Sequence, residues 1–177
     1  YGDCSAIVEA CISAYAQTVA MCPGDHWRKL PNGGRERVEG SALTRLIKRP
    51  NSYQTSSDFL LNLTRSLYGK GESFALAVRN NRFEIAEIHL MQYGYPYIAE
   101  DGSIFYSLAG NEIAEHRFDL SLPIPARDVL HVRLHTPKNP LKGVSPILAT
   151  TLSRALSGAA LNQQVAFYLN QARPSFM

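Results

Sequence analysis

The apolar residues at the start of the chain recur every three or four positions, which is the spacing of one helix face. Within residues 3–21 this face consists of Ile7, Ala10, Cys11, Ala14, Thr18 and Met21. The spacing predicts an amphipathic helix with a small-residue face suited to close packing, and Pro23-Gly24 ends it. The polar, glycine-rich segment 24–40 predicts a short hairpin that begins near Trp27.

A second, short helix is predicted for residues 41–48, with Leu43, Leu46 and Ile47 facing inward. The residue that precedes a proline is disfavoured in the helical region, so this helix stops before Pro50. It would therefore contribute one apolar side to the core.

A capping-box pattern opens the third predicted helix. Thr55 would accept a hydrogen bond from the backbone amide three residues later, and Asp58 would reach back to the cap. The helix runs to about Tyr68, and Gly69 and Gly71 supply its left-handed exit.

The pair Lys48-Arg49 lies between these two helices and could either bind nucleic acid or mark a helix end. Helix-end signals explain the residues around this pair without a ligand, because Pro50 stops one helix and Thr55 starts the next. We therefore assign the pair to the helix end, and expect any DNA contact in the acid-free stretch after Asp128.

From Glu72 the apolar period changes to two, which is typical of strands. The turn residues Asn80-Asn81 separate SFALAV from FEIAEIHLM, and Asp101-Gly102 separates YPYIA from SIFYSLA. A third strand pair is predicted from EHRFDL and VLHVRLH, joined by PIPARD. Together they predict a mixed or antiparallel sheet of about four to six short strands.

The last predicted element is a long helix, with Ser145 as its N-cap and Pro146 in its first turn, running to about Leu169. A helix that is apolar around its circumference should be buried or packed against other subunits. The candidate subunit-interface residues on it are Leu152, Ala155, Leu156, Ala159 and Ala160. The fold class is therefore α+β, with an α+β domain over residues 1–144 and the long alanine-rich helix in residues 145–177.

The composition of the 177 residues is globular, with 45% hydrophobic and 19% charged residues. No apolar run approaches the roughly 20 residues that cross a bilayer, so we expect no membrane contact. The net charge of +3 is modest, but after Asp128 the chain carries only cations: Arg133, Lys138, Lys142, Arg154 and Arg173. This bias favours an anionic neighbour, a phosphate backbone or an acidic subunit face, although a solvated or subunit-facing helix would also explain it.

The sequence predicts no catalytic residue, no cofactor site and no metal site. His131 and His135 would share one strand face about 13 Å apart, which is too far for one metal, so we expect a polar strand face there. Cys4, Cys11 and Cys22 form no metal-binding pair, and we expect reduced, mostly buried thiols.

Several motifs occur in a recognisable order. RPN precedes the capped helix, GxSPI opens the long helix, and N-x-ARPS closes it, with LYGKGES and DVLHVRL between the first two. This series resembles the portal proteins of tailed bacteriophages, of the HK-ninety-seven type, over nearly the whole chain. Gln171 departs from the pattern, since relatives often have glycine there.

The resemblance implies a non-catalytic subunit of a ring, typically of twelve copies, at one vertex of a phage or prophage capsid. Double-stranded DNA would pass through this ring, and its protein partners would be the terminase large subunit, the major capsid protein and a head–tail adaptor. The ring would assemble in the bacterial host cytoplasm and remain in the virion.

Within such a ring, residues 1–144 would form the outer wing and residues 145–177 the first stem helix. Lys138, Lys142 and Arg154 then become candidates for contact with DNA or the packaging motor. The chain begins at Tyr1 without an initiator methionine, and portals are usually more than twice this length, so we expect a fragment whose missing part follows Met177.

Two hypotheses from other classes remain beside this one. A sequence-independent nucleic-acid-binding domain would use the basic C-terminal stretch and the tyrosines. A Cys-His hydrolase would need Cys11 or Cys22 beside His26, and no local motif favours it.

Overall fold

The computed structural model describes residues 6–22 and 24–169, without the side chains of residues 151–154 and 157; Cys4, Gln171 and Arg173 lie outside this description. The elements are α1 (Ala6–Ala20), β1 (Trp27–Lys29), β2 (Arg35–Arg37), α2 (Ala42–Lys48), α3 (Ser56–Lys70), β3 (Glu72–Arg79), β4 (Ile85–Met91), β5 (Tyr93–Ile98), β6 (Ile104–Ala109), α4 (Glu112–Arg117), β7 (Ile124–Pro125), a 3-10 turn (Ala126–Asp128), β8 (Val129–Arg133), a second 3-10 turn η2 (Pro146–Thr150) and α5 (Thr151–Leu169). The predicted α+β class is confirmed. None of the described helices combines the length and apolar character needed to cross a bilayer.

Two three-stranded antiparallel sheets form the body. In the first sheet β3 lies between β4 and β8, and in the second β6 lies between β5 and β7. The main hydrophobic core consists of buried side chains from β3, β4, β6 and α4: Phe74, Leu76, Met91, Tyr106, Leu108 and Ala114. The two predicted hairpins around Asn80 and Asp101 are confirmed, while the strands divide into two sheets and do not form one.

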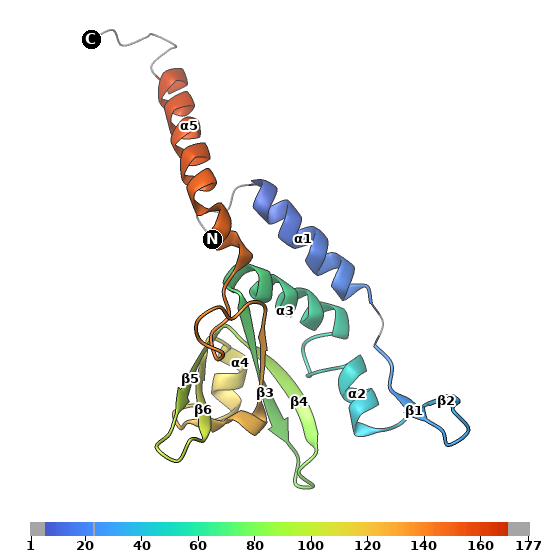
Figure 1. Ribbon diagram of the computed structural model, residues 1–177. Helices are drawn as coiled ribbons and strands as arrows, with labels where there is room; N and C mark the ends of the chain where they lie inside the picture. The colour runs from blue at the N-terminus through green and yellow to red at the C-terminus, as the bar shows by residue number, and fades with distance from the viewer. Residues whose placement is uncertain (1–5, 23, 170–177) are drawn as a thin grey trace.

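Helix α1 packs along α3 through the face that carries Ile12, Ala16 and Ala20 (Figure 1). The face predicted for packing is wrong, because all six of its residues are exposed: Ile7, Ala10, Cys11, Ala14, Thr18 and Met21. The helix is rich in small apolar residues on several sides, so its contact with α3 decides which side is buried. The expectation of buried thiols is also wrong, since Cys11 and Cys22 are both exposed.

The short helix predicted for residues 41–48 is confirmed as α2, and Ser41 caps it, with the Thr44 amide donating to Ser41 Oγ at 3.0 Å. The inward orientation predicted for Leu43 is wrong, because Leu43 is exposed and Thr44 is buried in its place. The Thr44 hydroxyl donates to the Val38 carbonyl oxygen at 2.7 Å. This bond satisfies the buried hydroxyl, which allows Thr44 to take the inward position.

The capping box of α3 is confirmed, with the Asp58 amide donating to Thr55 Oγ1 at 3.2 Å. The strand predicted for EHRFDL is wrong, because residues Glu112–Arg117 form α4. Asn111 caps this helix by accepting from the Ala114 amide at 3.1 Å, and a side-chain cap of this kind starts a helix where alternation alone favours a strand.

Candidate functional site

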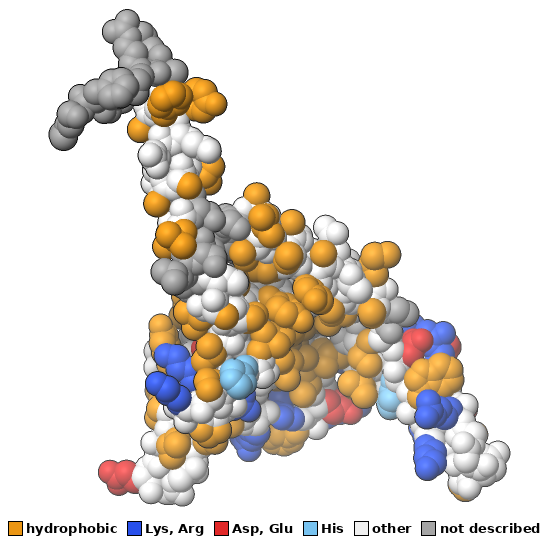
Figure 2. All heavy atoms as spheres, turned by 45° about the horizontal axis from the view of Figure 1, so that its top comes forward, with side chains coloured by type: hydrophobic (Ala, Val, Ile, Leu, Met, Phe, Trp, Pro, Cys, Tyr) orange, Lys and Arg blue, Asp and Glu red, His pale blue; other side chains and the backbone are white. Residues whose placement is uncertain are grey.

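Helix α5 projects away from the body with much of its apolar surface exposed (Figure 1). Residues 155–169 contain no charged residue. Large exposed apolar side chains follow one another along it: Leu156, Leu161, Val165, Phe167, Tyr168 and Leu169. Figure 2 shows apolar side chains over α5 and over the adjoining surface of the body. Contiguous exposed apolar surface of this kind marks an interaction site.

The start of α5 is fixed to the C-terminal end of α3. Ser145 Oγ donates to the Tyr68 carbonyl oxygen at 2.8 Å, and the same oxygen lies 3.2 Å from the donating amide of Ile147. Ser145 is buried, so both contacts are shielded from water. The helical run begins at Pro146 as predicted, but its first turn is a 3-10 turn and the α-helix starts at Thr151.

Two glycines allow the chain before α5 to cross the end of α3. Gly71 has φ of +89°, and a Cβ placed on it would overlap with the backbone of Val144 and Ser145. A Cβ on Gly143 would overlap with the Gly71 carbonyl. The Gly71 carbonyl accepts from the Leu134 amide at 3.0 Å. The motifs LYGKGES and GxSPI, about seventy residues apart in sequence, therefore meet in one tight backbone contact.

A buried histidine lies next to this crossing. His131 Nε2 is 3.4 Å from Glu72 Oε2, and Glu72 Oε2 also accepts from the Gly143 amide at 2.9 Å. The imidazole stacks on Phe74 at 4.2 Å between ring centroids, and its Nδ1 lies 3.2 Å from the Tyr106 hydroxyl. Since a carboxylate only accepts, the neutral tautomer with Nε2–H satisfies both contacts.

The expectation of a polar strand face at His131 is wrong, because the side chain is only 3% exposed. Burial lowers the pKa of His131, and the positive charge of Arg133 lowers it further, while Glu72 opposes both. The imidazole is therefore neutral at neutral pH and serves as a core residue. Its pairing with Glu72 follows from the register of β3 with β8, which sequence alternation does not define.

A second buried imidazole, His89, has a similar structural role. Its Nε2 lies 2.9 Å from Glu87 Oε2 and its Nδ1 lies 3.1 Å from the Tyr53 hydroxyl. The Glu87 carboxylate also accepts from Arg117 on α4 at 3.0 Å. Burial lowers the pKa of His89, and both ring nitrogens are engaged, so neither faces a substrate.

Cys22 and His26, two of the groups named in the hydrolase hypothesis, contact other residues. His26 Nδ1 lies 3.0 Å from Ser41 Oγ, and the Cys22 thiol donates to the Thr18 carbonyl at 3.4 Å. No thiol–imidazole contact and no group of three or more metal-ligating side chains occurs among the described residues.

The predicted site residues lie on the loop that precedes α5 and on α5 itself. Lys138 and Lys142 are exposed on the loop between β8 and η2, where the Arg133 guanidinium also donates to the Pro140 carbonyl. Neither lysine has a carboxylate within ion-pair distance in the described part of the chain. Of the candidate interface residues, those on α5 whose side chains are described are all exposed: Ala155, Leu156, Ala159 and Ala160. The side chains of Leu152 and Arg154 lie outside the description.

A family model described as phage portal protein matches residues 6–177. The chain therefore belongs to the phage portal protein family, as its motifs predicted. It is also 27% identical, over 174 residues, to an uncharacterized protein of Rickettsia bellii (strain RML369-C), covering 96% of this chain and 43% of that protein.

Solved structures share the fold. The chain resembles a protein in the neck of an empty GTA particle computed with C6 symmetry, with a TM-score of 0.72, 18% identity and coverage of 98% of this chain and 46% of that one. It also resembles a protein in the neck of a native GTA particle computed with C12 symmetry, with a TM-score of 0.66, 17% identity and coverage of 95% and 43%. A chain in the virion of a native gene transfer agent particle matches with a TM-score of 0.66, 18% identity and the same coverage. The chain thus spans less than half the length of these relatives.

Proposed function

We propose that this chain is part of a non-catalytic portal subunit that assembles into a ring for the passage of double-stranded DNA. The observation that carries the proposal is α5, a helix without charged residues from 155 to 169 that projects from the body with its apolar side chains exposed. An isolated helix with this surface would be poorly soluble, whereas neighbouring copies in a ring would cover it.

The relatives support this arrangement. Two of the similar structures come from particle necks computed with C6 and C12 symmetry, and a third comes from a virion. A ring of twelve copies at a capsid vertex is consistent with both symmetries, since a twelve-fold ring also contains six-fold symmetry. The comparisons give no support to the alternative of a free-standing nucleic-acid-binding domain.

The two parts of the chain take different roles in this proposal. Residues 1–144 form the wing, and residues 145–177 contribute the first stem helix. The backbone contact of Gly71 with residues 143–145 supports this division, because it fixes the base of α5 to the wing at one place. The helix direction is then determined by the wing, which is what a ring of parallel stem helices requires.

Contacts between neighbouring stem helices would involve small and apolar residues of α5, namely Leu152, Ala155, Leu156, Ala159 and Ala160. Small residues allow close approach of helix backbones. Lys138, Lys142 and Arg154 would face DNA or the terminase, and cations there contact phosphates without reading sequence. The remaining partners are the major capsid protein and a head–tail adaptor, and the ring assembles in the host cytoplasm before it becomes part of the virion.

The proposal is tested by measuring the mass of the full-length protein in solution with the variant Leu156→Glu. Full burial of a leucine side chain stabilises an association by about 1.5–3 kcal/mol, and a buried unpaired carboxylate reverses this gain. We expect a ring for the unchanged protein and a much smaller ring fraction for the variant.

The control variant is Leu122→Glu. Leu122 lies in a loop of the wing and is 68% exposed, close to the 66% of Leu156. It should leave the ring unchanged. Monomers of the unchanged protein under every assembly condition, or equal ring fractions for both variants, would contradict the proposal.

A further inference from the structure

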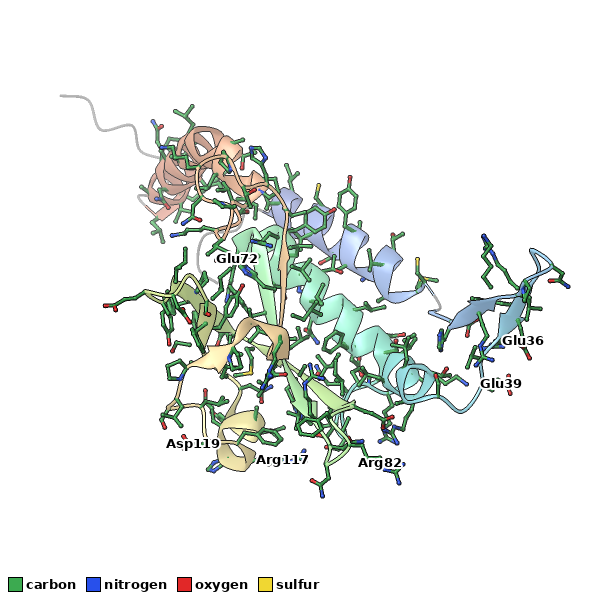
Figure 3. All side chains as sticks on the ribbon, turned by 60° about the horizontal axis from the view of Figure 1, so that its bottom comes forward. Glu36, Glu39, Glu72, Arg82, Arg117 and Asp119 are labelled. Carbon is green, nitrogen blue, oxygen red and sulfur yellow. The ribbon has the colours of Figure 1, made fainter. Side chains whose placement is uncertain are left out.

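A basic groove lies between α2 and the turn that joins β3 to β4. It is an open groove of about 990 Å³, and its charged lining residues are Arg45, Lys48, Arg49, Arg82 and Glu84. Figure 3 shows Arg82 and Glu72 at opposite ends of the β3–β4 hairpin, so this groove is remote from the base of α5.

The position of α2 beside the hairpin is fixed by buried contacts, and the groove is therefore a defined feature of the fold. The Ile88 amide on β4 donates to the Pro50 carbonyl at 2.7 Å, and the Asn51 side-chain amide donates to the Ile88 carbonyl at 2.9 Å. Asn51 is only 3% exposed, and its side-chain oxygen accepts from the Gln54 amide at 2.7 Å. The RPN motif thus attaches the Lys48-Arg49 pair to β4.

The four cations of the groove have no carboxylate partner. Among the described residues none of them lies within ion-pair distance of an acidic group, and the only hydrogen bond that one of their charged groups makes is from Arg49 to the Ser52 carbonyl at 3.3 Å. Glu84 is the one acidic residue of the lining, and it accepts from the Asn80 side chain at 3.2 Å. Four like charges around one concave surface repel one another, and an anionic ligand would relieve this repulsion.

Some arginines outside the groove are paired, while Arg28, Arg35 and Arg133 also lack an ion pair among the described residues. Arg37 pairs with Asp25, Arg65 with Glu9, and Arg79 with Asp128. Exposed cations also occur on the β1–β2 hairpin, but none of them lines the groove. The groove is therefore a place where unpaired cations and a concave surface coincide.

An exposed aromatic residue follows Arg82 in the same turn, although it is not one of the residues that line the groove. Phe83, in the turn that follows β3, has φ of +62° and is 81% exposed. This left-handed conformation is unfavourable for a bulky residue. The turn is maintained by Asn80 Oδ1, which accepts from the amides of Arg82 and Glu84 at 2.9 and 3.0 Å, and by Arg79, which donates to the Phe83 carbonyl at 2.8 Å.

We propose that the groove between α2 and the β3–β4 turn binds a short acidic peptide segment of a partner protein. The cations would receive carboxylates, and Phe83 would contact an apolar side chain of the same segment, since arginine and aromatic residues together are typical of protein-binding hot spots. A DNA duplex presents phosphates on a broad convex surface that would meet only the rim of the groove and would leave Phe83 unused. The inference does not depend on ring formation.

The test uses the full-length protein and a fluorescein-labelled peptide of eight residues in which aspartate and leucine alternate. Binding is measured by fluorescence anisotropy at low and high salt. We expect a dissociation constant in the range of about 10–100 μM that weakens with salt. The triple variant Arg45→Gln, Lys48→Gln, Arg82→Gln should weaken binding by at least about tenfold, and Phe83→Ala should weaken it by several fold.

The matched control is Arg28→Gln, which removes an exposed cation of the β1–β2 hairpin outside the groove. It should bind the peptide like the unchanged protein. A peptide in which asparagine replaces aspartate should not bind, and a 20-base-pair duplex should not compete.

The proposal is overturned if the aspartate peptide fails to bind at about 1 mM, or if the triple variant binds it unchanged. Competition by the duplex at lower concentration than the peptide would assign the groove to nucleic acid and would also overturn it. The variants are surface substitutions, so circular dichroism should show the unchanged fold, and the oligomer mass, measured separately, reports on the ring alone.

Discussion

Replacing Gly71 with alanine is expected to destabilise the connection between the body and α5. The residue has φ of +89°, where an alanine costs about 1–2 kcal/mol. The added Cβ would overlap with the backbone of Val144 and Ser145, so that this segment must move. Movement would break two hydrogen bonds, Leu134 N–H to the Gly71 carbonyl and Ser145 Oγ–H to the Tyr68 carbonyl, at about 1 kcal/mol each. The expected loss of unfolding free energy is therefore about 3–4 kcal/mol.

Gly69→Ala provides a matched control two residues earlier. Gly69 lies within α3, and a Cβ on it meets no atom within 4 Å. Alanine is favoured over glycine in a helix, so this variant should gain about 0.5–1 kcal/mol. Equilibrium urea unfolding, followed by circular dichroism, compares the two.

Hydrogen exchange of the same variants shows where the loss occurs. Gly71→Ala should increase the exchange of the amides in residues 134–145 before those of β6, because the substitution acts on the crossing and not on the core. A Gly71→Ala protein within about 1 kcal/mol of the Gly69→Ala protein would refute the reasoning.

Further predictions concern buried polar groups and the strained turn. Burial lowers the pKa of both His89 and His131, so just below pH 6.5 the folded state binds fewer protons than the unfolded state. The free energy of unfolding should therefore fall as the pH drops below 6.5. The expected slope is at most about 1.4 kcal/mol per pH unit for each imidazole. His131→Gln should reduce that slope, and a slope that stays unchanged would contradict the assignment. Asn51→Ala should cost about 2–4 kcal/mol in urea unfolding, because it leaves the Ile88 carbonyl and two backbone amides without their partner; a loss below about 1 kcal/mol would be inconsistent with this. Phe83→Gly should raise the melting temperature, because it releases the positive φ, and a decrease would show that Phe83 makes a stabilising contact.

Local sequence signals predicted local structure well. The capping residue Thr55 defines where α3 begins, and the turn residues Asn80-Asn81 and Asp101-Gly102 define two hairpins. These features depend on hydrogen bonds between residues a few positions apart, so they can be predicted from a short stretch of sequence.

Features that depend on distant contacts were predicted poorly. The buried face of α1 is selected by α3, and His131 is buried because β8 pairs with β3, neither of which follows from apolar spacing. The Lys48-Arg49 pair was assigned to a helix end, and it does occupy one. Its position in a groove with Arg82 depends on the hydrogen bond from the Asn51 side chain to the Ile88 carbonyl, which joins residues 37 positions apart.

The candidate interface on α5 stays a prediction, and its signal lies in the composition of the helix. A helix whose residues 155–169 carry no charge must be covered by something, and the structure leaves it exposed. Which neighbour covers each residue depends on other copies and on the rest of the subunit.

Electron microscopy of the full-length protein tests the central claim most directly. The account predicts a closed ring in which the α5 helices of neighbouring copies pack against one another through the surface that includes Leu156 and Ala159. A ring in which this surface of α5 faces solvent, or a protein that remains monomeric under all assembly conditions, would contradict it.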